Sequence, residues 1–265
     1  MPDWLRLALG TLTVFRVPPP RVVNSHVAAR AMLAAPVVGV VLSIPAALIV
    51  WIIPAAAGRG TTTSSVAIAA LAAVLGLTAL AALTRALHLD GLADTADGLG
   101  SGRNGADALT VMSKSDIGPF GVVTLVLVLL IDVASLTVCI TAGRGVLALV
   151  VAVVVSRAVL PLACRRGVPA ARSTGLGATV AESVSPPAAI AAVALATILS
   201  VAAGYSTGGK GVAIACLLAA LGGLLGGLVL LRRCCARLGG VTGDVVGAMV
   251  ETTLCVALVI FAVTA

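Results

Sequence analysis

Residues 118–141 read GPFGVVTLVLVLLIDVASLTVCIT, an almost unbroken apolar run that contains one charged residue, Asp132. About 20 consecutive apolar residues are enough for an α-helix to cross the hydrocarbon core of a bilayer. Because lipid offers no hydrogen-bond partners, a single segment that crosses it has to be helical. The run therefore predicts a transmembrane helix and places the chain among membrane proteins.

Six further apolar runs are long enough, or nearly long enough, to cross a bilayer. They lie at about residues 31–53, 66–87, 146–163, 187–203, 212–231 and 245–264. The runs at 146–163 and 187–203 are short, so six spans plus a re-entrant segment are an alternative to seven. The sequence predicts an all-α polytopic helical bundle with about seven transmembrane helices, formed by residues 1–265 as a single membrane-embedded domain.

The composition agrees with this class. Hydrophobic residues make up 60% of the chain and charged residues 10%, which leaves too little polar surface for a soluble domain of this size. The formal net charge is +7, as in many nucleic-acid-binding proteins, but only 2% of the residues are aromatic, so bases have little to stack on. We expect a lipid membrane and no nucleic acid as macromolecular partner; a homo-oligomer is compatible with this class.

Lys and Arg residues are distributed unequally between alternate loops. With the amino terminus in the cytoplasm, thirteen lie on the cytoplasmic side, whereas Arg59, Arg144 and Lys210 lie on the other. Cytoplasmic loops of membrane proteins carry an excess of these residues, so we expect a multi-pass protein of the cytoplasmic (inner) membrane whose active face is turned to the cytoplasm. Residues 4–15, ahead of the prolines at 18–20, are predicted to form an interfacial helix.

Three of the ten acidic residues lie within eight positions of the segment LHLDGLADTADGLG, residues 87–100. In a helix, Asp90, Asp94 and Asp97 stand at i, i+4 and i+7, so their carboxylates share one face. Such charges repel each other unless a cation neutralises them, and oxygen ligands of this kind suit Mg²⁺ or Mn²⁺. The alternative is a solvated acidic helix end, but the interspersed glycines, which let a backbone or ligand approach closely, favour a metal–phosphate site.

The connection between the second and third spans is too long for a structureless loop. We expect the helix of the second span to continue through Asp97 and a glycine-rich turn to follow at residues 98–102. A short helix over about residues 106–112, with Asn104 or a neighbour as its cap, completes the predicted connection.

Two further segments carry polar side chains that are unusual in a membrane protein. Arg157 lies inside a span, where a charge needs a partner; the partner is either Asp132 or a phosphate group. Arg172 precedes a glycine-rich turn whose backbone N–H groups favour an anion. Both arginines are therefore candidate phosphate ligands.

The other segment is GGVTGDVVGAMVE, residues 239–251. It predicts a tight turn that enters a helix with Asp244 at or near the N-cap, and capping alone would explain that residue. Glu251 lies two turns later on the same face and inside the last span, where a carboxylate needs a partner or water. Carboxylates and arginines on one face suit metal-assisted phosphoryl transfer, in which an acid or a histidine takes the proton of the attacking hydroxyl.

Several of these segments resemble known motifs. His88–Gly98, followed by Ile117–Gly121, resembles the signature of the cobalamin synthase (adenosylcobinamide-GDP ribazoletransferase) family. The segments Arg157–Gly177 and Gly239–Glu251 are similar to that family's other polar motifs in the same order, and Phe15–Pro18 is similar to its amino-terminal motif. The resemblance covers essentially the full length.

The resemblance implies a Mg²⁺-dependent membrane transferase of late cobalamin (vitamin B12) biosynthesis. It would join adenosylcobinamide-GDP to α-ribazole, or to α-ribazole 5'-phosphate, with release of GMP. Asp90, Asp94 and Asp97 would then hold Mg²⁺ on the pyrophosphate, and we hypothesise that Asp94 and His88 are catalytic, His88 as the base or as a substrate contact. The expected substrate-binding residues are Arg103, Lys114, Arg157, Arg172, Thr242, Asp244 and Glu251.

Two other classes of membrane protein share features with this chain. A CDP-alcohol-type membrane phosphotransferase also uses aspartates clustered on a helix, but that family's pattern has Arg after Asp-Gly-x-x-Ala, whereas this chain has Asp94 in the place of the Ala and Thr95 in the place of the Arg. A proton-relaying transporter predicts acids near the bilayer midplane, where only Asp132 and Glu251 are expected. The CDP-alcohol-type enzyme is kept as the alternative function.

Overall fold

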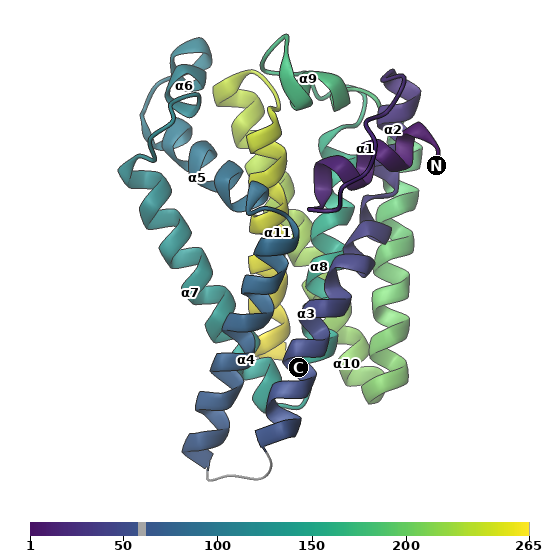
Figure 1. Ribbon diagram of the computed structural model, residues 1–265, viewed down its shortest axis with the longest axis vertical. Helices are drawn as coiled ribbons and strands as arrows, with labels where there is room; N and C mark the ends of the chain where they lie inside the picture. Colours follow the sequence, from purple (N-terminus) through teal and green to yellow (C-terminus); the bar gives the residue numbers. More distant parts are fainter. Residues whose placement is uncertain (58–61, 265) are drawn as a thin grey trace.

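The computed structural model describes residues 1–57 and 62–264, and the described residues form eleven helices and no strand (Figure 1). The short helices are α1 (Asp3–Leu12), α2 (Ser25–Leu33), α5 (Leu87–Gly100), α6 (Gly105–Met112) and α9 (Gly175–Val180). The long helices are α3 (Ala35–Ala57), α4 (Thr62–Leu83), α7 (Pro119–Thr141), α8 (Gly145–Ala163), α10 (Pro186–Leu238) and α11 (Gly243–Thr264). The predicted all-α class is confirmed.

Six of the described helices are long and apolar enough to cross a membrane, namely α3, α4, α7, α8, α10 and α11. α10 contains two crossing limbs, because Gly208 and Gly209 have non-helical dihedral angles inside it. A Cβ atom on Gly204 would lie 3.2 Å from Cα of Ala213, whereas nine residues of straight helix span about 13 Å. The chain therefore reverses at these glycines (Figure 1), and five single helices plus two limbs give the seven predicted segments.

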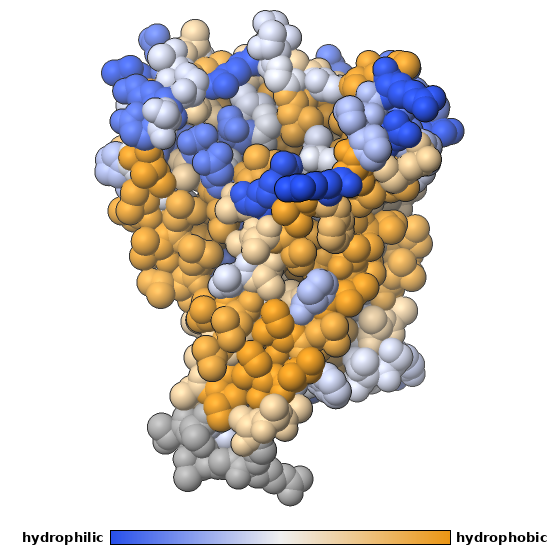
Figure 2. Space-filling view, in the orientation of Figure 1, coloured by the Kyte–Doolittle hydropathy of each residue, from blue (hydrophilic) through white to orange (hydrophobic). Residues whose placement is uncertain are grey.

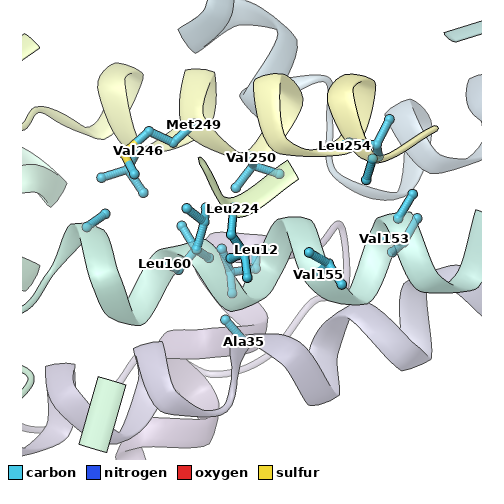
Figure 3. Close-up of a cluster of buried hydrophobic side chains, with 14 of the residues drawn as sticks. Leu12, Ala35, Val153, Val155, Leu160, Leu224, Val246, Met249, Val250 and Leu254 are labelled. Carbon is cyan, nitrogen blue, oxygen red and sulfur yellow. The ribbon is translucent and has the colours of Figure 1, made fainter. Parts of the chain in front are cut away.

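The helices α8 and α11 form the centre of the bundle. Within their most apolar stretches 78% and 72% of the residues are buried, against 22% in α7 and 28% in α4, which face outward. Val246 and Leu254 of α11 lie opposite Leu160 and Val153 of α8 (Figure 3), and all four side chains are buried. Close packing of this kind leaves little freedom, so α11 is held firmly and positions the residues of its first turn.

Polar residues gather at one end of the bundle, beyond an apolar belt (Figure 2). The short helices α1, α2, α5, α6 and α9 lie at this polar end, and α1 runs across the long helices (Figure 1), in agreement with the predicted interfacial helix. The α7–α8 turn with Arg144 and the α10 turn with Lys210 lie at the opposite end (Figure 1). Arg59 falls outside the described residues. The structure thus separates the charges as predicted, and their cytoplasmic side stays a prediction.

The predicted continuous helix from the second span through Asp97 is wrong. α4 ends at Leu83, and α5 begins at Leu87. Arg85 and Ala86 between them have φ values of 56° and 54°, a left-handed conformation that a right-handed helix cannot include. The N–H of Ala86 donates to the carbonyl of Ala81 (2.7 Å), as in a Schellman-type helix end. α5 is therefore a separate helix that is free to take its own direction at the polar end.

Two other boundaries also differ from the prediction. The first apolar run divides, because Ala34 separates α2 from α3, and the Asn24 side chain caps α2 by accepting from Val27 N (2.9 Å). The short helix predicted near residues 106–112 is confirmed as α6, although its N-cap residue Asn104 makes no side-chain capping bond. α5 extends to Gly100, so the predicted turn at residues 98–102 is largely helical.

Candidate active site

The helix α5 crosses α11 at two glycines. A Cβ atom on Gly91 of α5 would lie 2.6 Å from the carbonyl oxygen of Asp244, and one on Gly247 of α11 would lie 3.2 Å from Cα of His88. A larger residue would force the first pair of backbones apart. The glycine that the sequence marks as a close-approach position thus brings α5 onto the first turn of α11.

Substituting Gly91 by alanine should therefore reduce both stability and activity. The added methyl group must push α5 away from the Asp244 backbone. Overpacking of this kind lowers the free energy of unfolding by about 1–3 kcal/mol. We expect a lower melting temperature in detergent and a loss of turnover that is larger than the loss of folded protein. The matched control is Gly211→Ala in α10, where a Cβ atom meets nothing within 4 Å; equal behaviour of the two variants would contradict the prediction.

The crossing gathers carboxylates from both helices. Asp90 is exposed, and Asp94 and Asp244 are half-buried. Burial, followed by the negative charges of Asp90, Asp244 and Asp97, raises the pKa of Asp94 to about 6, and the Arg172 guanidinium opposes this shift. The backbone of Gly91, between Asp90 and Asp94, lies against the backbone of Asp244, and Arg172 and Asp244 line one cavity. The structure therefore brings the predicted aspartate motif, Asp244 and Arg172 together in one site, which we call the aspartate site (Asp90, Asp94, Asp244).

Asp97 fixes the site to α7. Its Oδ2 accepts from the N–H of Gly118 (2.7 Å) and its Oδ1 from the N–H of Gly121 (2.9 Å). Both donors belong to the amino-terminal turn of α7, which attracts negative charge. This contact, which spacing alone did not indicate, explains why the aspartate motif and the Ile117–Gly121 motif occur together. The metal-binding role of Asp97 stays a prediction.

The first turn of α11 is capped by Thr242. Its hydroxyl accepts from the N–H of Val245 (3.2 Å) and donates to Oδ2 of Asp244 (3.2 Å). Asp244 therefore lies near the N-cap, as predicted, but the alternative that capping alone explains it is wrong, because Thr242 is the cap. With the cap supplied by a neighbour, the Asp244 carboxylate is oriented by one hydroxyl and keeps acceptor capacity for a ligand.

Arg172 reaches the site from the loop before α9. Its Nη2 donates to the carbonyl of Leu109 in α6 (2.7 Å). The loop pairs with the segment before α11, because Ala171 N donates to Val241 O and Val241 N donates to Pro169 O, both at 2.9 Å. Between the two segments lies a cavity of about 240 Å³ whose lining includes Arg172 and Asp244. The sequence did not predict this cavity, although the glycines that build its walls stand in the segments it singled out.

Arg103 and Lys114 lie at the polar end and are exposed. The carbonyl of Arg103 accepts from Nη2 of Arg237 (2.7 Å), which ties the loop after α5 to the end of α10. Within the described residues neither side chain forms an ion pair. The structure does not draw them to the aspartate site, and their substrate-binding role stays a prediction.

His88, Arg157 and Glu251 lie together on the other side of α5, and we call them the buried cluster. They are 4%, 0% and 8% exposed, which separates them from solvent. His88 Nδ1 lies 3.8 Å from Oε1 of Glu251, and burial, with the nearby positive charge of Arg157, lowers the pKa of His88 to about 3. At about 100° per residue, His88 points roughly opposite to the three aspartates, so α5 turns it away from the aspartate site.

Arg157 does not pair with Asp132, which was one predicted partner. Its Nη1 donates to Oγ of Ser156 (2.7 Å) and its charge lies near Glu251, and no ion pair joins it to Asp132 among the described residues. Asp132 lies beside Cys255. A cavity of about 20 Å³ between Asp132 and Glu251 has room for one water molecule.

The aspartate site offers carboxylate oxygens, the kind of ligand that Mg²⁺ prefers. Within the described residues, no three His, Cys, Asp or Glu side chains converge closely enough to hold a metal ion by themselves. Mg²⁺, however, is commonly bound by one or two carboxylates together with waters and substrate phosphates. Burial, and after it the charges of Asp90 and Asp244, raises the pKa of Asp94, and a divalent cation would relieve this repulsion between like charges. The residues present therefore fit a Mg²⁺ ion shared with a phosphate substrate.

Comparison with known proteins agrees with this geometry. The family model described as cobalamin-5-phosphate synthase matches residues 4–262. The chain belongs to this family. This cobalamin-5-phosphate synthase family member is 39% identical in sequence to the adenosylcobinamide-GDP ribazoletransferase of Frankia casuarinae. The alignment covers 98% of this chain and 94% of the relative.

Two further members carry the same name, adenosylcobinamide-GDP ribazoletransferase. The protein of a Nocardioides species is 40% identical over 99% of each chain, and that of Bradyrhizobium diazoefficiens is 36% identical over 97% of this chain and 92% of its own length. No solved structure matches the chain.

Proposed function

We propose that the chain is an adenosylcobinamide-GDP ribazoletransferase, which joins adenosylcobinamide-GDP to α-ribazole or its 5'-phosphate and releases GMP. The observation that carries the proposal is the convergence of Asp90 and Asp94 with Asp244 and Arg172 at the polar end of a membrane bundle. Carboxylates beside an arginine suit a phosphate-bearing substrate with a bound cation. Family membership over residues 4–262 supports the same activity.

Mg²⁺ is the proposed cofactor. Asp90, Asp94 and Asp244 would hold it, with Asp97 as a further predicted ligand behind them. When bound, Mg²⁺ would offset the charge of the pyrophosphate and stabilise charge on the transferring phosphoryl group. Asp97 would also keep α5 on the α7 amino terminus.

The chemistry requires one exchange at phosphorus. A ribazole hydroxyl oxygen bonds to the phosphorus that carries the corrinoid side arm, the bond to GMP breaks, and the hydroxyl proton leaves to solvent at the open polar face. Positioning and charge stabilisation dominate such transfers, and Asp94, Asp244 and Arg172 are placed to provide them. We assign His88 a supporting role beneath α5, because it is 4% exposed and turned away from the aspartates.

The polar end is proposed to face the cytoplasm from the cytoplasmic (inner) membrane. The excess of Lys and Arg in the loops of that end supports this orientation. GMP and the nucleotide donor are polar molecules that would enter and leave from an aqueous side, which the open aspartate site offers.

The activity can be tested on detergent-purified protein. Incubation with adenosylcobinamide-GDP and α-ribazole should yield equal amounts of GMP and the corrinoid product with Mg²⁺, and neither with a chelator. Formation of neither product by folded protein with Mg²⁺ would contradict the proposal. CDP-alcohol donors would then be assayed next, because the aspartate site fits that chemistry too.

A further inference from the structure

The cavity beside Asp244 is not accounted for by the transfer reaction at phosphorus. It has a volume of about 240 Å³ and lies between the loop that includes Arg172 and the first turn of α11. Given the proposed ribazoletransferase activity, on which this inference rests, two substrate parts are small enough to enter it. These are the guanosine end of the donor and the acceptor nucleoside, because a corrinoid ring system is far larger than either.

The walls of the cavity are held by backbone contacts. The hydrogen bonds between Val241 and the Pro169–Ala171 segment join its two sides, and a Cβ atom on Gly177 would lie 2.7 Å from Cα of Thr242. Backbones in direct contact have little room to shift. The cavity is therefore formed before any substrate arrives, as ligand sites usually are.

The chemistry of the lining distinguishes the two candidate occupants. Leu87, Leu176 and Ala178 supply apolar surface, and Thr174, Thr242 and Asp244 supply polar groups. Asp244 is the one carboxylate of the lining and is assigned above to the cation, so no carboxylate or amide side chain of the lining is left to pair with a guanine edge. Guanine carries N–H donors and a carbonyl along its edge, and leaving them unpaired against apolar walls is unfavourable. The base of ribazole is a dimethylated benzimidazole, whose edge carries methyl groups and no N–H donor. The apolar lining suits this base.

Arg172 adds a cation at the rim of the apolar lining. One of its nitrogens, Nη2, is engaged by the carbonyl of Leu109 (2.7 Å), and among the described residues its guanidinium forms no ion pair. A guanidinium has five N–H donors and binds phosphate in a bidentate manner. Its remaining donors are therefore available for a phosphate group carried by the occupant.

We propose that this cavity, here named the acceptor cavity, binds the ribazole acceptor. Its base lies against Leu87, Leu176 and Ala178, and a 5'-phosphate lies on Arg172. The ribose then borders Asp244, so that a ribose hydroxyl faces the aspartate site where the pyrophosphate is held. The acceptor that this arrangement favours is the phosphorylated nucleoside.

The test compares two acceptors in the same variant. In Arg172→Gln, the KM for α-ribazole 5'-phosphate should rise about 10- to 100-fold relative to the KM for α-ribazole, because a charge-assisted contact is lost. The ratio of the two KM values cancels any general effect of the substitution on the neighbouring aspartates, since that effect changes the KM of both acceptors. Arg166→Gln, an exposed arginine of the same loop that does not line the cavity, should leave the ratio unchanged.

A second variant tests the cavity independently of Arg172. Ala178→Leu places a larger side chain in the lining and should raise the KM of both acceptors about tenfold, while the KM of adenosylcobinamide-GDP stays unchanged. If this variant does not fold, the ratio in Arg172→Gln decides. Wild-type protein that transfers nothing would overturn the proposed function; wild-type transfer with an unchanged ratio, or with a raised donor KM alone in Ala178→Leu, would overturn only the acceptor cavity.

Discussion

Replacing Asp94 by asparagine should remove transfer and, at the same time, raise the melting temperature of the metal-free protein. The ordinary pKa of an aspartate is near 3.8, and burial together with Asp90, Asp244 and Asp97 raises that of Asp94 to about 6. The folded protein therefore binds the proton more tightly than the unfolded chain, and stability falls as pH rises between these values. Asparagine stays neutral, so the variant avoids this loss at neutral pH.

The same substitution removes a central carboxylate of the aspartate site. Turnover should fall by at least about 100-fold, the scale seen when one charge-stabilising group is deleted from an active site. Mg²⁺ should raise the melting temperature of the wild type, because ligands that bind only the folded state stabilise it, and should do so far less in Asp94→Asn.

Both readouts come from thermal unfolding in detergent and from GMP release, each measured with and without Mg²⁺. Asp107→Asn is the matched control, because Asp107 is an exposed acid of the neighbouring helix α6. It should keep turnover and the response to Mg²⁺. Retained Mg²⁺-dependent turnover in Asp94→Asn would show that the site is misassigned, whatever its melting temperature.

The spans and the helical aspartate motif could be predicted from local sequence because each depends on a local rule. A long apolar run in lipid has to be helical, and the spacing of Asp90, Asp94 and Asp97 fixes their common face in any helix. The break before α5 could not be predicted, because Arg85 and Ala86 are not glycines and yet adopt left-handed conformations. A contact of Arg85 Nη2 with Gly10 O (3.0 Å), distant in sequence, accompanies that break.

Which residues come together at the aspartate site depends on long-range packing. The meeting of Asp244 with Asp94 follows from the α5–α11 crossing at Gly91, which no local spacing encodes. The contact of Asp97 with Gly118 likewise joins two motifs that in the sequence are only successive segments. The separation of His88 from the aspartates, in contrast, follows from a local rule, since the roughly 100° helical step sets it on the opposite side of the helix; its catalytic role stays a prediction.

Replacing Glu251 by glutamine should destabilise the fold strongly. Arg157 is 0% exposed, its Nε and Nη2 have no hydrogen-bond partner among the described residues, and Glu251 is the acid whose charge lies near it. Arg157 and Glu251 form no direct ion pair among the described residues, but removing the acid leaves the Arg157 charge buried and uncompensated, which typically costs about 3–5 kcal/mol. We expect a large fall of the melting temperature in detergent. Glu182→Gln, the substitution of an exposed acid, should change it little.

A double variant separates a structural role of the buried cluster from substrate binding. Replacing both charges by apolar residues of similar size, in Arg157→Met with Glu251→Leu, removes the unpaired charge and should restore most of the stability. If the pair only holds α8 and α11 together beneath α5, this variant also transfers with a KM for each substrate close to that of the wild type. Restored stability without transfer would return Arg157 and Glu251 to the substrate-binding role that the sequence predicted, and would require α5 to move so that substrate can reach them.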